Sequence, residues 1–120
     1  MSGTRARHTS ENARLAKAWV NFDGTTGTTS QDDVTINSSF NISSVTDRAT
    51  GRYTLNFETA MANTNYAAAG MCGNGVGTNI TNTHDVMQDT VMTTSSFGVK
   101  CSQENTDIDK VYIAIIIFGD

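Results

Sequence analysis

Two segments of alternating polarity in the first half of the chain constrain its fold most. In residues 51–57, apolar and polar side chains alternate, with Tyr53, Leu55 and Phe57 on one face and Arg52, Thr54 and Asn56 on the other. Side chains alternate across a strand, so this segment predicts a strand with one buried face. The segment 39–46 precedes it, and the connection 47–51 ends in Gly51, which can supply the positive φ of a hairpin loop. A strand at 17–22 with Trp19, ending at Asp23 and Gly24, comes first, so we expect an antiparallel meander.

The rest of the chain is also typical of strands. Thr, Ser, Asn and Gly are abundant, Lys and Glu are scarce and Pro is absent from the 120 residues, a composition that favours strands and turns over helices. A chain of this length can bury one core. The predicted strands are 17–22, 34–36, 39–46, 51–58, 65–72, 86–94, 96–101 and 110–118. Short strands separated by turn residues indicate an all-β fold, a single antiparallel β-sandwich over residues 17–120.

Residues 1–16 are predicted to form a basic N-terminal arm, with a short helix over 10–16 that Ser10 caps. Arg5, Arg7, Arg14 and Lys17 against Glu11 give residues 1–17 a net charge of +3, which leaves −7 for the remainder of a chain whose total is −4. A basic arm on an acidic body favours docking on an acidic protein neighbour, and a solvated terminus is the alternative. Nucleic-acid binding is not expected, because no aromatic residue is interleaved with these basic residues.

Residues 111–118 are apolar at every position, so both faces of this last strand must be covered. An exposed strand of this kind promotes aggregation. We therefore expect one face in the core and the other in a homo-oligomeric interface. The interface residues predicted in this way are Tyr112, Ile113, Ile115, Ile116 and Ile117. The alternative is an interior strand overlaid by the N-terminal segment.

The sequence of residues 17–24, 39–47 and 50–57, with Tyr66 shortly after, resembles a domain at the C-terminal ends of tail fibres and related virion proteins of bacteriophages, especially marine ones. The resemblance covers residues 17–73 and returns in 111–115. It implies a small β-sandwich displayed on a virion as a homotrimer, made in the host cytoplasm, with a host-attachment role. The implied partners are other virion proteins and a glycan or protein of the host surface. The alternative is a capsid decoration or other purely structural subunit that binds only neighbouring virion proteins, and Arg5, Arg7 and Arg14 are the residues expected to dock on such neighbours.

The longest predicted irregular stretch, residues 73–85, is the candidate recognition surface. Long loops on a rigid sandwich often carry binding residues, and amide and hydroxyl groups make the directional hydrogen bonds that sugars require. The candidate receptor-binding residues are Asn74, Thr78, Asn79, Thr81, Asn82, Thr83, His84 and Asp85. A plain solvated connection is the alternative.

Catalytic and metal sites are not expected. The spacing of Ser, His, Cys and Asp offers no nucleophile with a base, so the chain is not expected to be an enzyme or to need a cofactor. His84 and Asp85 with Asp89, and Asp107 with Asp109, lack the pattern of a calcium loop and are interpreted as exposed carboxylates. Without a run of about 20 apolar residues we expect no membrane insertion. Cys72 and Cys101 can form a disulfide, but the reducing cytoplasm favours two buried thiols.

Overall fold

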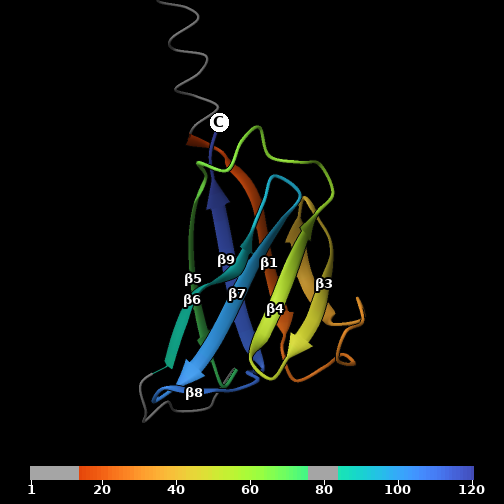
Figure 1. Cartoon of the computed structure of the whole chain (residues 1–120), viewed down its shortest axis with the longest axis vertical. Helices are drawn as coiled ribbons and strands as arrows, with labels where there is room; N and C mark the ends of the chain where they lie inside the picture. The colour runs from red at the N-terminus through yellow and green to blue at the C-terminus, as the bar shows by residue number, and fades with distance from the viewer. Residues whose placement is uncertain (1–13, 76–83) are drawn as a thin grey trace, which may run out of the picture.

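The computed structural model describes residues 14–75 and 84–120, and there the chain is built of strands with almost no helix (Figure 1). The strands are β1 (Ala16–Asp23), β2 (Thr35–Phe40), β3 (Ile42–Ala49), β4 (Arg52–Phe57), β5 (Ala67–Gly73), β6 (His84–Met92), β7 (Ser96–Gln103), β8 (Thr106–Asp107) and β9 (Tyr112–Phe118). Outside residues 34–46, each predicted strand is present with its ends close to the predicted positions. The short β8 was not predicted.

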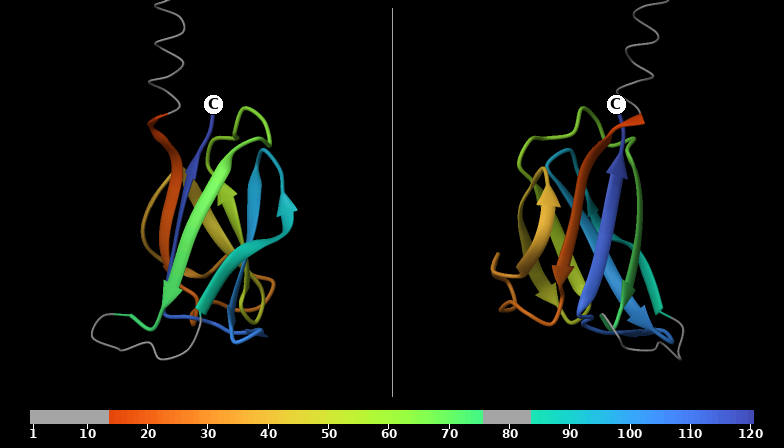
Figure 2. Two further views of the ribbon diagram at one scale, coloured as in Figure 1. Left: turned by 90° about the vertical axis from the view of Figure 1, so that its left-hand side faces the viewer. Right: turned by 180° about the vertical axis from the view of Figure 1, so that it is seen from behind.

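The strands form two antiparallel sheets that face each other, which is the arrangement of a β-sandwich. Sheet A has the order β2-β1-β9-β5, and sheet B has the order β3-β4-β7-β6 with β8 paired to β7. Figure 2 shows the two layers from the side on the left and sheet A in front on the right. The predicted all-β fold is therefore confirmed.

One hydrophobic core fills the space between the sheets. Tyr53, Leu55 and Phe57 of β4 point into it, as their alternation predicts. The ring of Tyr53 meets Phe22 of sheet A edge to face, with centroids 5.1 Å apart. Sheet A contributes Ala18, Val20, Phe22, Ile113, Ile115 and Ile117 to this core, and sheet B contributes Ile42, Val45, Phe97, Val99 and Cys101.

The prediction of one strand over residues 39–46 is wrong, because the chain changes sheets at Asn41. β2 ends at Phe40 in sheet A and β3 begins at Ile42 in sheet B. Asn41 has a φ of 59°, in the left-handed region that asparagine tolerates better than most residues. The expected meander is broken here: β1 pairs with β2 and β9, while β3 pairs with β4.

β9 lies inside sheet A between β1 and β5. Its alternation turns Ile113, Ile115 and Ile117 into the core, where each is at most 4% exposed. This corrects the assignment of these three residues to an oligomer interface, because they are already covered within one subunit. Tyr112 and Ile116 lie on the opposite, outer side of the strand. β1 lies beside β9 in the sheet, and residues 1–13 are outside the described part of the chain.

Candidate functional site

The outer side of sheet A is apolar. Among the described residues, eight large apolar side chains are exposed, and five of them lie on this one surface: Trp19, Phe40, Met71, Ile116 and Phe118. The register brings them together, since Trp19 is paired with Phe40 on one side and with Ile116 on the other. Ala67, Ala69, Tyr112 and Ala114 complete the surface, which we call the apolar face.

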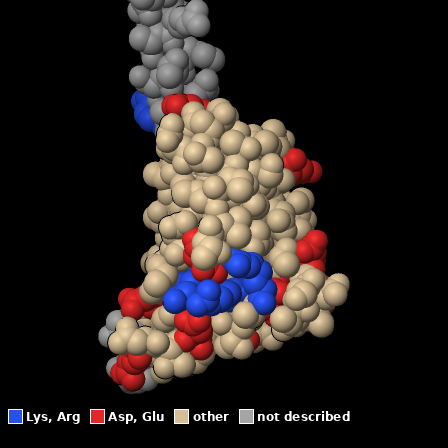
Figure 3. Space-filling view, in the orientation of Figure 1, with Lys and Arg blue, Asp and Glu red and all other residues tan. Residues whose placement is uncertain are grey.

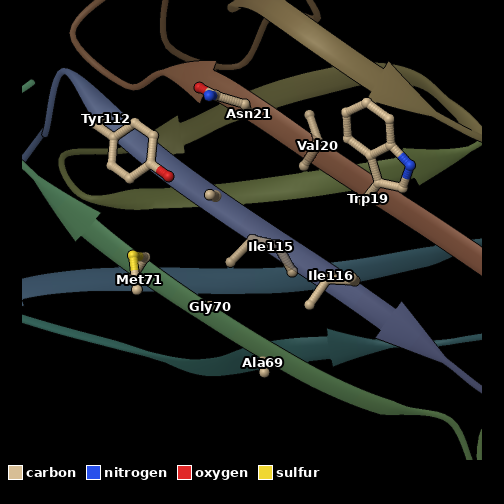
Figure 4. A pocket seen from close by; sticks show the side chains of 10 residues that line it. Trp19, Val20, Asn21, Ala69, Gly70, Met71, Tyr112, Ile115 and Ile116 are labelled. Carbon is tan, nitrogen blue, oxygen red and sulfur yellow. The ribbon is translucent and has the colours of Figure 1, made fainter. Parts of the chain in front are cut away.

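The apolar face is hollowed along its middle. A depression of about 580 Å³ runs between Trp19 and Tyr112, which lie toward its opposite ends in Figure 4. Small residues of two neighbouring strands line it: Ala69 and Gly70 in the edge strand β5 and Ala114 in the interior strand β9. A second depression of about 540 Å³ adjoins it and is lined by the amides of Asn21, Asn37 and Asn74 as well as by Met71 and Tyr112.

Charge is nearly absent from the apolar face. β2, β5 and β9 contain no Asp, Glu, Lys or Arg, and β1 has only Lys17 near its start and Asp23 at its end. Four strands spaced by about 4.8 Å and about seven residues long give a surface of roughly 20 by 23 Å. The apolar part of this surface is comparable in size with the roughly 300–600 Å² found for the largest, often functional, apolar patch of a monomer.

The outer side of sheet B is polar, and its Lys and Arg side chains form ion pairs with Asp side chains. Figure 3 shows its Lys and Arg gathered in one place beside Asp side chains. Arg48 and Arg52 both bind the carboxylate of Asp89, at 3.0 and 3.4 Å, and this side chain is only 5% exposed. Arg52 also binds Asp107 at 3.1 Å, and Lys100 lies 3.5 Å from the same carboxylate. This ion-pair cluster makes its part of the outer side of sheet B charged, in contrast to the apolar face.

The predicted receptor-binding residues are only partly described. Thr78, Asn79, Thr81, Asn82 and Thr83 lie outside the described residues. Asn74 and His84 meet at the buried ammonium group of Lys110, which donates to Asn74 Oδ1 at 2.9 Å and lies 3.4 Å from His84 Nε2. Asp85 is exposed.

Lys110 is the residue of this region that sequence reasoning missed. Its Nζ also donates to Gln103 Oε1 at 2.8 Å, and the residue is 5% exposed. Through these contacts, Lys110 connects the segment before β9 with the end of β5, the start of β6 and the end of β7. A single lysine between Asp109 and Val111 belongs to no motif, so no sequence signal distinguishes it from a surface lysine.

Of the acidic residues considered as metal ligands, Asp89, Asp107 and Asp109 are held by other contacts, and Asp89 is buried, not exposed as expected. Asp89 and Asp107 bind arginines, as above, and Asp109 Oδ1 accepts hydrogen bonds from the Tyr53 hydroxyl and the Gly51 amide, both at 2.7 Å. Burial, reinforced by Asp109, raises the pKa of Tyr53 well above its ordinary value, so the phenol stays protonated and acts as a tether. In the described part of the chain no three His, Cys, Asp or Glu side chains lie close enough to hold a metal ion.

The basic arm lies mostly outside the described residues. Arg5 and Arg7 and most of the predicted helix fall in residues 1–13, and of the arm's arginines only Arg14 is described, where it is exposed. β1 begins at Ala16, close to the predicted boundary. No helix in residues 14–75 or 84–120 is long and apolar enough to cross a membrane.

The chain was compared with protein-family models, with curated proteins and with solved structures, and none of the three comparisons gave a significant match.

Proposed function

We propose that this chain is a structural protein of a bacteriophage virion, a module like the tip of a tail fibre that forms a homotrimer and attaches the particle to the host surface. The apolar face of sheet A is the observation that carries the proposal. The resemblance of residues 17–73 to the C-terminal domains of phage tail fibres supports the same assignment.

The apolar face suits association with further copies of this chain. An exposed, nearly uncharged sheet surface that carries Trp19 and Phe40 has the composition of an obligate interface core, where aromatic residues are enriched and charged residues depleted. Burying roughly 400 Å² of apolar surface on each subunit contributes on the order of 10 kcal/mol before the entropic cost of association. Three such faces can close around a three-fold axis, with the small residue Ala114 permitting close approach.

The polar outer side of sheet B also favours the apolar face of sheet A as the interface between subunits. Its outer side carries the ion-pair cluster around Asp89, whose desolvation in an interface is costly. Among the described residues, Met87 at 41% is the one exposed large apolar side chain on sheet B. In the trimer, sheet A therefore faces the axis and sheet B faces the solvent.

Substitutions on the two sides of β9 test this proposal. Ile116→Asp places a charge on the apolar face, where the side chain is 38% exposed in a single chain, and is expected to give a folded monomer. Ile115→Asp places the charge in the core, where Ile115 is 4% exposed, and is expected to unfold the protein. Sedimentation velocity should give wild-type particles of about three times the 12.9 kDa mass of one chain, and circular dichroism reports whether each variant is folded.

Met87→Asp is the matched control, because Met87 is as exposed as Ile116 but lies in sheet B. It should leave the trimer intact. A wild-type protein that sediments as a folded monomer at micromolar concentration contradicts the trimer, and dissociation by Met87→Asp instead of Ile116→Asp places the interface on the wrong sheet.

Host attachment is proposed for the end of the sandwich that carries the β5–β6 connection. The start of β1 and the C-terminus lie at one end of the domain, and the end of β5 and the start of β6 lie at the other (Figure 1). If the first end joins the particle, the second end points outward.

The test of attachment replaces residues 76–83 by a Gly/Ser segment of equal length, which retains Asn74 and His84 at Lys110. Adsorption of the particle to host cells is then measured alongside assembly. Loss of adsorption with normal assembly supports receptor binding. Unchanged adsorption assigns the chain to the purely structural alternative, a decoration or other subunit that binds only virion proteins through Arg5, Arg7 and Arg14.

A further inference from the structure

Two thiols lie near the end of the sandwich where β5 and β6 meet. Cys72 is on β5 in sheet A and Cys101 is on β7 in sheet B, so neither sheet alone brings them together. Cys101 is fully buried in the core, and Cys72 packs against that core with part of its surface exposed. Both are free thiols in the structure.

The strand register explains their proximity. Cys72 Sγ lies 3.7 Å from the carbonyl oxygen of Asp85 on β6. Asp85 is paired with Ser102, the residue next to Cys101, and Val86 is paired with Cys101 itself. Cys72 packs against the core cluster that contains Cys101, so its thiol lies on the inner side of sheet A at the level of Cys101 in sheet B.

We propose that Cys72 and Cys101 form a disulfide between the two sheets when the folded protein meets a low-molecular-weight disulfide such as oxidised glutathione. This inference depends only on the fold and stands independently of the proposed function. A cross-link here ties β5, the edge strand of sheet A, to an interior strand of sheet B.

The reaction proceeds by thiol–disulfide exchange. Cys72, the accessible thiol, loses its proton and attacks one sulfur of oxidised glutathione, which forms a mixed disulfide and releases one glutathione thiolate. Cys101 then loses its proton and attacks Cys72 Sγ, which forms the Cys72–Cys101 bond and releases the second glutathione. The two protein thiols lose two electrons and two protons, and one glutathione disulfide becomes two thiols.

The surroundings set the rate and the order of the two steps. Burial raises the pKa of both thiols, and the charge of the nearby Lys110 opposes this increase. Exchange is therefore slow at neutral pH and accelerates as the pH rises. Cys101 is fully buried, so oxidised glutathione reaches Cys72 first.

The experiment incubates the reduced, folded protein with oxidised glutathione at pH 8.5 and follows intact mass and alkylation by N-ethylmaleimide after denaturation. The wild type should lose two hydrogens, accept no maleimide and form no dimer on a non-reducing gel. Cys101→Ala should retain one glutathione on Cys72, because no second thiol can release it. Cys72→Ala should keep its thiol at Cys101 unmodified.

Thermal unfolding separates a native cross-link from an incidental one. A bond that closes residues 72–101 in native geometry should raise the melting temperature of the oxidised wild type by about 10 °C, an increase that reductant reverses and that neither Ala variant shows. Wild-type protein that stops at the glutathione adduct, stays a dithiol, or cross-links only in denaturant overturns the proposal. A melting temperature lowered by oxidation overturns it as well, because the bond then strains the fold.

Discussion

The side-chain amide of Asn41 pairs with the backbone of Thr59 as one strand pairs with another. Asn41 Oδ1 accepts a hydrogen bond from Thr59 N at 2.7 Å, and Asn41 Nδ2 donates to Thr59 O at 3.0 Å. The same Nδ2 donates to Lys17 O at 3.0 Å. Asn41 therefore joins the crossing between the sheets to β1 and to the segment after β4, while its backbone takes the φ of 59° that the crossing needs.

Replacing Asn41 tests these two contributions separately. Asn41→Ala loses the side-chain hydrogen bonds and strains a left-handed residue, and should lower the free energy of unfolding by about 3 kcal/mol. Asn41→Gly loses the same bonds without the strain, so its loss should be about 1 kcal/mol smaller. Urea denaturation gives both values. Equal losses in the two variants contradict the role of the backbone conformation, and Asn37→Ala, at an exposed asparagine, is the control.

Gly51 is enclosed by backbone atoms at the β3–β4 turn. Its φ is 72°, and an added Cβ would lie 2.6 Å from Ile108 N and 2.7 Å from Cys101 O. Backbone atoms yield less readily than side-chain ends, so Gly51→Ala should lower the free energy of unfolding by about 3 kcal/mol. Thr50→Ala, at the exposed neighbouring position, should change it by less than about 0.5 kcal/mol. A neutral Gly51→Ala, measured by urea denaturation, contradicts this packing.

The sequence predicted what depends on local pattern. The alternation around Tyr53 correctly gave the buried side of β4, and the positive φ of Gly51 was expected from its place in the hairpin loop. The crossing at Asn41 was missed because an asparagine between two strand-like segments shows no sign of its φ. The core-facing residues of β9 were assigned to an interface because a run of eight consecutive apolar residues does not reveal which side of the strand faces the core of its own subunit.

Two carboxyl groups should respond to pH in opposite directions. Burial, with smaller effects of Asp109 and Asp33, raises the pKa of Asp47, whose Oδ1 has no hydrogen-bond partner among the described residues. A group with a raised pKa in the folded state adds stability below its unfolded pKa of about 3.9 and loses it as the pH rises through the folded value. Asp47→Asn should therefore melt at a higher temperature than wild type at pH 7, with the difference shrinking toward pH 4.

Asp107 provides the matched comparison. The hydrogen bond from Arg52 lowers the pKa of Asp107, so its contribution is present above the unfolded pKa and is lost as the pH falls through the folded value. Asp107→Asn should melt at a lower temperature than wild type at pH 7. Melting curves from pH 4 to pH 8 give both comparisons, and shifts of the same sign at pH 7 contradict the assigned environments.

The shared carboxylate of Asp89 makes Arg48 and Arg52 energetically dependent on each other. Asp89 keeps one cation when either arginine is replaced, so Arg48→Met and Arg52→Met should each cost only about 1 kcal/mol, in keeping with arginines that are about one-third exposed. The double variant leaves a buried carboxylate without a cation and should cost more than the sum, by about 1 kcal/mol or more. In the Asp89→Asn background this coupling should disappear. Free energies that add in both backgrounds would show that the two ion pairs act independently, each on its own side of the carboxylate.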